Sequence, residues 1–565
     1  MLTLIFPLTA FAQADAGKTA NPATEGAAEL QRSSGLPDGA TAAPAGTSNE
    51  AAQPAPAADN TPPTDPSKPG QKEEAVQGPA PTNTGAPATP RSVLVEDDGV
   101  TGHIGGQLRF SYQKDSSFPA DNAGTTFSPG PMETRVRVIP EVHYRGFGFL
   151  AEADTATGAV LGNPDDKLIV DQTPHPAFNP LDMRQVYLEY KWRTGIFRVG
   201  QQTSQWGLGM VANAGAKDPE AGDFGQTHFG DSAYRALLAG RPFFNLGGAW
   251  RALEPALAVD LVVRDGTANY ADGDRAVQGV FALRFAADAE KYLGFYAVYR
   301  HQTAVNVNDG SRAADVIVLD LAGKWHFMHN DWRDLYVGFE GAYITGTTTL
   351  GRTDTAPQYD VRQFGAAVKA SYRYGNGQVY LDFGYASGDQ NPNDAKQEAF
   401  KFNRDYPVGL VLFNEVLGYQ SARAAARASD PNLLGRPPEG VNLVPTQGAF
   451  TGAVYLFPKV RYGVREWLDV YGGPMFAWTS AKLTDPFNSK IGGGTSINYL
   501  GAHPGDYLGT ELDVGLQVRF HPVPQLTLSG TLEGGVLFPG DAFNMGVGGV
   551  MGPVGLGRIR LSANL

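Results

Sequence analysis

Cysteine is absent from all 565 residues of the chain. Disulfides, thiolate metal sites and cysteine nucleophiles are therefore excluded together, and the redox compartment is left open. Basic residues are in the minority, with 45 Lys and Arg against 58 Asp and Glu, and the net charge of -13 argues against a broad nucleic-acid-binding surface. After the N-terminus there is no run of about 18 apolar residues, so we expect no transmembrane helix.

The N-terminal residues MLTLIFPLTAFAQADAG combine an apolar stretch with Ala10-Phe11-Ala12, a small-x-small cleavage pattern. We expect 1–12 to be the remnant of a signal peptide whose positively charged n-region is missing, which puts the true start upstream. The alternative is a short buried apolar segment. Residues 13–95 are rich in Ala and Pro and cannot bury enough surface to fold, so we predict a disordered periplasmic linker.

From about residue 101 onward, apolar and polar residues alternate with a period of two, which is typical of β-strands. The segment 507–538, YLGTELDVGLQVRFHPVPQLTLSGTLEGGVLF, contains two such runs joined by a short turn. One face of the first run holds Leu508, Thr510, Leu512, Val514, Leu516, Val518 and Phe520. The opposite face holds Gly509, Glu511, Asp513, Gly515, Gln517 and Arg519. Such a strand separates an apolar environment from an aqueous one.

Short and long connections alternate along this region of the sequence. The short ones include YRGFG, KWRTG, FAADAEK, HNDWRD, YGNG, GVREW and HPVPQ, and 241–255 is a longer exception among them. The long polar connections are expected at 156–182, 201–233, 265–275, 302–313, 346–358, 388–449, 479–505 and 539–550. This asymmetry is typical of transmembrane barrels, which have short periplasmic turns and longer external loops.

A soluble β-sandwich also alternates, because one of its faces is solvated. Its strands average about five or six residues, whereas those predicted here run about 9–14, long enough to cross a bilayer at a tilt. Aromatic residues also gather at the strand ends, as in interface girdles: Tyr144, Tyr190, Trp192, Trp325, Phe327, Trp332, Trp467 and Trp478. We therefore predict an all-β protein, an antiparallel transmembrane barrel over 101–565 with about 18 strands (16–18).

The polar face of the predicted strands would line the lumen. We predict these lumen-lining residues: Arg109, Arg135, Arg137, Arg198, Arg264, Arg284, Arg300, Arg461, Arg519, Arg558, Arg560, Glu340, Asp382, Glu511, Asp513 and Glu533. Arginine dominates the basic set although the whole chain is acidic. Arginines and acids could pair across the wall and brace it, or surplus arginines could form a path for anions. A barrel of about 18 strands cannot be filled by its own wall side chains, which favours a wide channel.

Several segments carry a family resemblance. YLGTELDVGLQVRF, LFPGDAF (537–543) and GYASGDQNP (384–392) resemble the alginate-export-type outer-membrane porin superfamily. RVGQQTSQWGLGMVANAG (198–215), FKFNRDYPVGLVLFNEVLG (400–418) and AVYLFPKVRY resemble more strongly uncharacterised Gram-negative outer-membrane β-barrel proteins related to them. The resemblance implies a barrel of about 18 strands with an arginine-rich lumen. The many lumen acids and the insert 388–449 depart from the alginate-exporter pattern.

The functional prediction is an outer-membrane, porin-like channel for polar or anionic solutes, including oligo- or polysaccharides. The insert 388–449 could form a constriction or plug, or an external cap, so the alternative is a closed surface barrel. A barrel-wall hydrolase is the third hypothesis, with His143 and Glu141 as its nearest approach to a catalytic dyad; we expect no enzyme, cofactor or metal site. Expected partners are outer-membrane lipid, the barrel-assembly machinery and an anionic saccharide solute, with no nucleic acid.

Overall fold

The computed structural model describes residues 92–97, 99–162, 178–215, 221–225, 227, 230–246, 248–286, 291–306, 310–330, 332–350, 357–391, 394–429 and 445–565. The predicted signal remnant and nearly all of the predicted linker lie outside these residues. Strand β1 (Ser92–Asp97) begins inside the range expected to be linker and pairs with the start of β2 (Val100–Asp115).

Within the described residues, eighteen antiparallel strands form a closed ring, because each pairs with the next and β22 returns to pair with β2. The strands that follow β2 in the ring are β5 Met132–Tyr144, β6 Phe147–Leu161, β7 Phe178–Trp192, β8 Gly195–Thr203, β9 Ser232–Gly240, β10 Leu253–Arg264, β11 Arg275–Ala286, β12 Tyr292–Asn306, β13 Gly310–His329, β14 Arg333–Thr348, β15 Tyr359–Tyr374, β16 Gly377–Ala386, β18 Ala453–Arg465, β19 Leu468–Thr479, β20 Tyr507–Val523, β21 Leu526–Pro539 and β22 Val554–Asn564. This confirms the predicted fold class and strand number.

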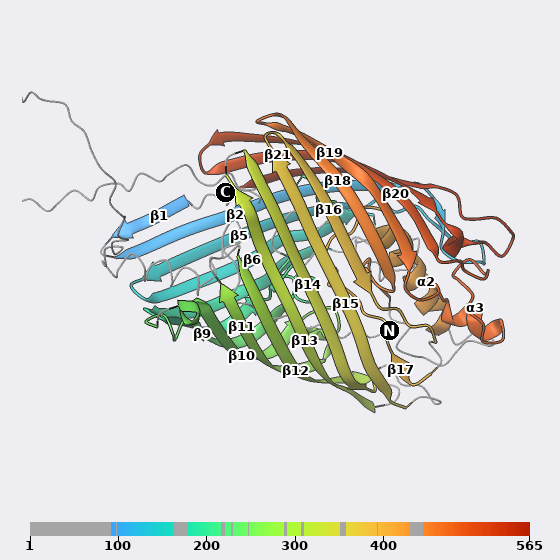
Figure 1. Ribbon diagram of the computed structural model, residues 1–565, viewed down its shortest axis with the longest axis horizontal. Helices are drawn as coiled ribbons and strands as arrows, with labels where there is room; N and C mark the ends of the chain where they lie inside the picture. Colours follow the sequence, from blue (N-terminus) through green and yellow to red (C-terminus); the bar gives the residue numbers. More distant parts are fainter. Residues whose placement is uncertain are drawn as a thin grey trace, which may run out of the picture.

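Short elements lie in the connections. They are β3 Phe118–Pro119, β4 Thr126–Phe127, β17 Lys396–Gln397, the 3-10 helices η1 Gly248–Ala252, η2 Tyr270–Asp272 and η5 Asp541–Phe543, the π-helix η3 Leu412–Leu417, and the α-helices α2 Gly418–Ser429 and α3 Pro486–Ile491. Helices α2 and α3 lie at the end of the barrel opposite to the C-terminus (Figure 1). No helix among the described residues is long and apolar enough to cross a membrane.

The expected alternation of short and long connections is confirmed. Two-residue turns join β15 to β16 and β20 to β21, whereas the connections after β8 and β16 run over 204–231 and 387–452. In the first of these turns Gly375 has a φ of 55°, a left-handed conformation that glycine adopts without strain. The N-terminal end of β2 and the C-terminal end of β22 both lie at the side of the barrel that has the short turns (Figure 1). Outer-membrane barrels have this arrangement.

The structure corrects one predicted connection and one predicted strand face, and it adds one long connection. The long connection predicted at 302–313 is wrong, because β12 continues to Asn306 and β13 begins at Gly310. A long connection at 116–131, between β2 and β5, was not predicted. Leu508 is 1% exposed and does not share the outer face of Leu512, because a register shift opposite Gly509 reverses the order of faces there.

The outer surface is apolar along the strands. Many large apolar side chains are more than one third exposed on the face opposite to the buried charges; examples are Leu108, Val259, Ile317, Leu381, Val514 and Leu561. Of the predicted girdle residues, Trp325 is partly buried and stacks on Phe339 at 6.2 Å, and the other seven are exposed. A closed ring leaves no unpaired strand edge, so this surface suits a hydrocarbon environment.

Candidate functional site

The predicted lumen-lining residues all lie on the buried face of their strands. Most are under 9% exposed, and four are partly exposed: Arg198, Arg264, Arg461 and Arg519. Their contacts, however, are mainly with one another and with two connections that enter the barrel. The site is therefore built from the inner wall and these two connections together.

Carboxylates shared by two arginines recur around the inner wall. Glu533 forms an ion pair with Arg558, whose Nη2 lies 2.7 Å from its Oε2, and Arg560 Nη2 lies 3.8 Å from the same oxygen. Glu254 accepts hydrogen bonds from Arg284 at 3.0 Å and Arg241 at 2.6 Å. Arginine's planar fork suits such shared contacts, because each guanidinium offers five N–H donors.

The same sharing occurs at two further places. Asp469 on β19 accepts from Arg461 at 3.0 Å and also from Arg519. Asp154 on β6 pairs with Arg137 at 2.6 Å and lies 3.9 Å from Arg135. Simpler pairs complete the wall: Arg198–Glu189, Arg235–Asp260, Arg264–Asp182, Arg300–Asp265 and Lys459–Asp382. At the shared sites the guanidinium groups outnumber the carboxylates.

Connection 204–231 crosses the interior of the barrel. At one end Glu340 on β14 accepts backbone N–H groups of Leu208 at 2.5 Å, Met210 at 3.1 Å and Val211 at 3.0 Å. Gly207, with a φ of 53°, turns the chain so that these N–H groups converge. Consecutive amides arranged in this way form a concave site for an anion, and here a wall carboxylate fills it.

The other end of this connection is held by arginines. Arg109 and Arg135 donate to the carbonyl oxygen of Thr227 at 3.1 Å and 2.9 Å, and Arg560 donates to that of Gly225 at 2.7 Å. These arginines stand on β2, β5 and β22, and β14 is eight pairings away from β2 by the shorter way around the ring of eighteen. The connection therefore runs between nearly opposite walls of the barrel.

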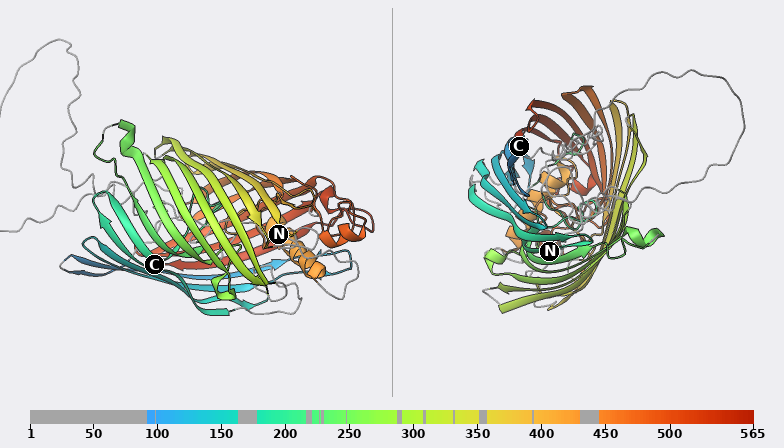
Figure 2. Two further views of the ribbon diagram at one scale, coloured as in Figure 1. Left: turned by 90° about the horizontal axis from the view of Figure 1, so that it is seen from below. Right: turned by 90° about the vertical axis from the view of Figure 1, so that its left-hand side faces the viewer.

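The connection 387–452 enters the barrel in the same manner. Glu511 on β20 accepts the N–H groups of Leu410 at 2.5 Å, Val411 at 2.8 Å and Leu412 at 2.7 Å. Gly409, with a φ of 67°, precedes them as Gly207 precedes the first set. The π-helix η3 and the α-helix α2 follow directly, and α2 is seen within the ring of strands (Figure 2).

Apolar contacts join both connections to the inner wall in one continuous core. Trp206 stacks on Tyr296 at 5.0 Å and donates to Asp320 at 2.8 Å. A Cβ on Gly294 would lie 2.7 Å from Trp206, and one on Gly365 would lie 2.4 Å from Phe400. The wall thus provides glycine gaps into which aromatic side chains of the connections fit. Within the predicted insert 388–449, residues 399–427 are mostly buried, and many belong to the same apolar core as the inner wall.

Sequence reasoning missed four buried arginines, Arg184, Arg235, Arg312 and Arg427. Arg235 is 2% exposed and follows the ordinary alternation of SAYRALLAG, so the period of two could have found it. Arg184 is 1% exposed, yet it lies at a register shift between β6 and β7 where the neighbouring Gln185 is buried as well. No alternation pattern predicts the face of a residue at such a bulge.

The histidine considered for a catalytic dyad lies in an ion-pair network. His143 Nε2 is 2.5 Å from Glu141 Oε1, and its Nδ1 is 3.6 Å from Glu189. Glu189 in turn pairs with Lys191 at 3.2 Å and Arg198 at 3.0 Å. These contacts match the wall pairs described above.

Comparisons with known proteins identify only distant structural neighbours. No family model and no curated protein matches this sequence. Among solved structures, Pseudomonas aeruginosa OccK5 (OpdH) is similar over 82% of this chain and 98% of its own, with 12% identity and a TM-score of 0.43. The outer membrane protein OprD from the same organism is similar over 84% and 95%, with 11% identity and a TM-score of 0.42. Scores this low add nothing to the strand pairing and say nothing about a solute.

Proposed function

We propose that this protein is an outer-membrane channel that conducts small polar and anionic solutes, acidic saccharides among them, through an arginine-rich lumen. The observation that carries this proposal is the repeated sharing of one carboxylate by two arginines on the inner wall. Around each shared carboxylate the guanidinium groups are in excess, so the local potential is positive, which attracts anions and repels cations.

The two inward connections would set the width of the path. Connection 204–231 runs between opposite walls, so it narrows the lumen as an inserted loop rather than leaving it open over its whole width. In this arrangement the outer apolar surface faces lipid, the short turns and the N-terminal segment face the periplasm, and the barrel-assembly machinery inserts the chain. The acidic saccharide is the solute class suggested by the alginate-export resemblance.

The test is the current through the refolded full-length protein in a planar bilayer under a KCl gradient. We expect chloride to permeate better than potassium. In the double variant Arg461→Gln/Arg519→Gln we expect the chloride-to-potassium permeability ratio to fall several-fold. Both side chains are partly exposed and share Asp469, so the change removes two positive charges from one site on the inner wall.

The matched control is Arg362→Gln, which removes an arginine whose side chain is 61% exposed on the opposite strand face. It should leave the permeability ratio unchanged. A wild-type channel that prefers potassium, or a double variant with the wild-type ratio, would overturn the anionic part of the proposal.

The second candidate function is a closed barrel whose external surface carries the activity. The continuous apolar core between the wall and both connections favours it, since such packing is typical of a plug. It predicts no current from the folded protein, and current once an anchor such as Glu511 is removed. The same bilayer recording therefore separates the two functions.

A further inference from the structure

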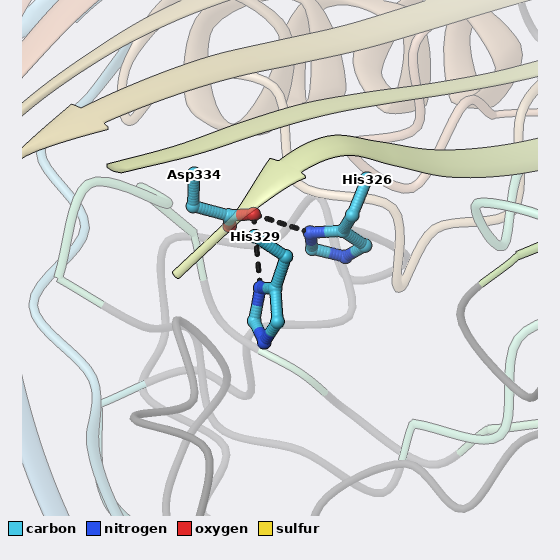
Figure 3. Close-up of side chains that lie close together, drawn as sticks. All are labelled: His326, His329 and Asp334. Carbon is cyan, nitrogen blue, oxygen red and sulfur yellow. Dashed lines mark hydrogen bonds and ion pairs between the residues drawn. The ribbon is translucent and has the colours of Figure 1, made fainter. Parts of the chain in front are cut away.

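Three potential metal ligands, His326, His329 and Asp334, meet at the β13–β14 turn. His326 Nδ1 lies 2.7 Å from Asp334 Oδ1, and His329 Nδ1 lies 3.1 Å from the same oxygen. Figure 3 shows both imidazoles directed at this carboxylate. The three ligand atoms all lie within 4.8 Å of one another. The sequence analysis predicts no metal site, so this cluster is new information from the fold.

A break in strand pairing brings the two histidines to one face. His326 pairs with Tyr336 and His329 pairs with Asp334, so three steps along β13 match two steps along β14. In a regular strand, residues three apart point to opposite faces. The extra residue of this bulge removes that opposition, and both rings contact the carboxylate of Asp334, which is 1% exposed on the inner face.

The spacing of the three atoms suits a shared cation. Two ligands at about 2.1 Å from a metal are about 3.0 Å apart at a right angle and about 3.4 Å apart at the tetrahedral angle. The observed hydrogen-bond separations of 2.7 Å and 3.1 Å lie within a few tenths of an ångström of the smaller value, so small side-chain shifts would admit a cation. The His329 side chain is 44% exposed, which provides an entry path, whereas His326 packs edge to face against it at 5.4 Å and is 11% exposed.

The donor set selects the class of metal. Two imidazoles and one carboxylate suit first-row transition metals such as Zn²⁺, Co²⁺ and Fe²⁺ better than Ca²⁺ or Mg²⁺, which prefer oxygen ligands. Without a cation, the two rings share one oxygen as hydrogen-bond partners, which is the simpler interpretation. Arg373 stands opposite Asp334 in the β14–β15 strand register. A positive charge at that position would weaken the affinity of the site for a cation.

We propose that His326, His329 and Asp334 bind a divalent first-row transition-metal ion at the short-turn mouth of the barrel. On binding, the proton that each histidine donates from Nδ1 to Asp334 would leave Nδ1, to solvent from an imidazolium or to Nε2 by tautomer exchange. Nδ1 would then coordinate the ion, with a proton on Nε2. Three protein ligands leave coordination positions for water, as in sites that exchange their metal or bind a further ligand. This site is independent of the solute that the lumen conducts.

The test uses the refolded full-length protein made without a polyhistidine tag. Zn²⁺ binding is measured by calorimetry, and Co²⁺ is added separately so that its visible absorption reports imidazole and carboxylate coordination. We expect one saturable site with a micromolar dissociation constant. In His329→Ala we expect the affinity to fall at least tenfold, because one of three ligands is lost while the exposed position tolerates the change.

The control variant is His301→Ala. His301 Nδ1 lies 2.8 Å from Asp315, with side chains 51% and 47% exposed, so this pair offers only two ligands. The His301→Ala variant should bind Zn²⁺ with the same affinity as the wild type. Asp334→Asn should also lose affinity, with folding checked by circular dichroism. The proposal fails if the wild type shows no saturable binding below about 1 mM, or if His329→Ala binds Zn²⁺ as tightly as the wild type.

Discussion

On β22, β2 and β5 the inner wall carries Arg558, Arg560, Arg109, Arg135 and Arg137. On β11, β12, β13 and β15 it has an apolar stretch of Ala282, Val298, Val316, Val318, Ala322 and Ala367 beside the charged Arg284, Arg300 and Asp320. Both regions contact the inward connections, but by different means. The charged region donates hydrogen bonds to backbone carbonyls of 225 and 227. The apolar region offers small side chains and glycine gaps to aromatic rings.

This difference shows that facing inward does not by itself mean facing water. Along the apolar stretch of β13, large side chains lie outside and smaller ones inside, as in Ile317 and Leu319 against Val316 and Val318. The outer face meets lipid and the inner face meets a packed connection. In the charged region each of these arginines has at least one carboxylate or backbone carbonyl partner, which offsets much of the cost of burying it. Four experiments can sharpen or break this comparison.

The largest effect is expected from removing the anchor of the insert. Glu511→Ala leaves the buried N–H groups of Leu410, Val411 and Leu412 without their acceptor, and each such loss costs about 1–3 kcal/mol. We expect mean conductance to rise several-fold and trypsin to cleave between 401 and 427 in the folded barrel. Glu511→Gln, which keeps one acceptor oxygen, should show a smaller change. Unchanged conductance and unchanged protection in Glu511→Ala would show that the apolar contacts alone hold the insert.

The apolar region itself is tested by filling a gap. In Gly365→Val the new side chain would overlap Phe400, and overpacking of this kind typically costs about 1–3 kcal/mol. We expect partial release of the insert, seen as frequent current transitions and faster proteolysis. The matched control is Gly279→Val on β11, where a Cβ meets nothing within 4 Å. Equal behaviour of the two variants would contradict the role of the gap.

The charged region is tested by removing a shared carboxylate. Glu533→Gln leaves Arg558 and Arg560 without the anion they share, so the positive potential of this wall increases. We expect the chloride-to-potassium permeability ratio to rise by about a factor of two. The measurement is the reversal potential in a KCl gradient, compared with that of Glu533→Asp, which keeps the charge. A ratio that falls or stays constant would mean that these arginines do not act on the permeating ions.

The smallest effect is expected outside the barrel, in the connection that contains α3. Asp485 caps this helix by accepting from Asn488 N–H at 2.9 Å, and burial raises the pKa of its carboxyl from 3.8 to about 6. Because the folded state binds the proton more tightly than the unfolded one, the capped connection is most stable below pH 4. That stability is lost as the pH rises from 4 to 6.

Hydrogen exchange of the amides in 485–492, corrected for intrinsic rates, checks this expectation. Exchange should be roughly tenfold slower at pH 4.5 than at pH 7. A tenfold change is what a difference of about one pKa unit between the folded and unfolded states produces. Asp485→Asn keeps a side-chain oxygen for the cap but does not titrate, so its corrected exchange should be independent of pH. A wild-type protein with the same flat profile would show that burial does not control this carboxyl.

Much of the barrel could be predicted from residues alone. The period of two located Arg109, Glu340 and Glu511 on the buried face, and the spacing of turn residues gave the alternation of short and long connections. These features are local, since alternation and turn chemistry need only neighbouring residues. Bulges defeated the same reasoning at Leu508 and Arg184, because a single extra residue in the pairing reverses the face.

The sequence by itself determined that this chain makes a closed antiparallel barrel with an apolar exterior and a charged interior wall, because those properties follow from the alternation within each strand. Only the tertiary structure decided what the interior contains. The contacts of Glu340 with 208–211, of Glu511 with 410–412 and of Arg109 with Thr227 join residues about 100 or more positions apart. Such contacts depend on closure of the ring, which places β14, β20 and β2 around one lumen. No local sequence pattern specifies which distant residues come into contact there.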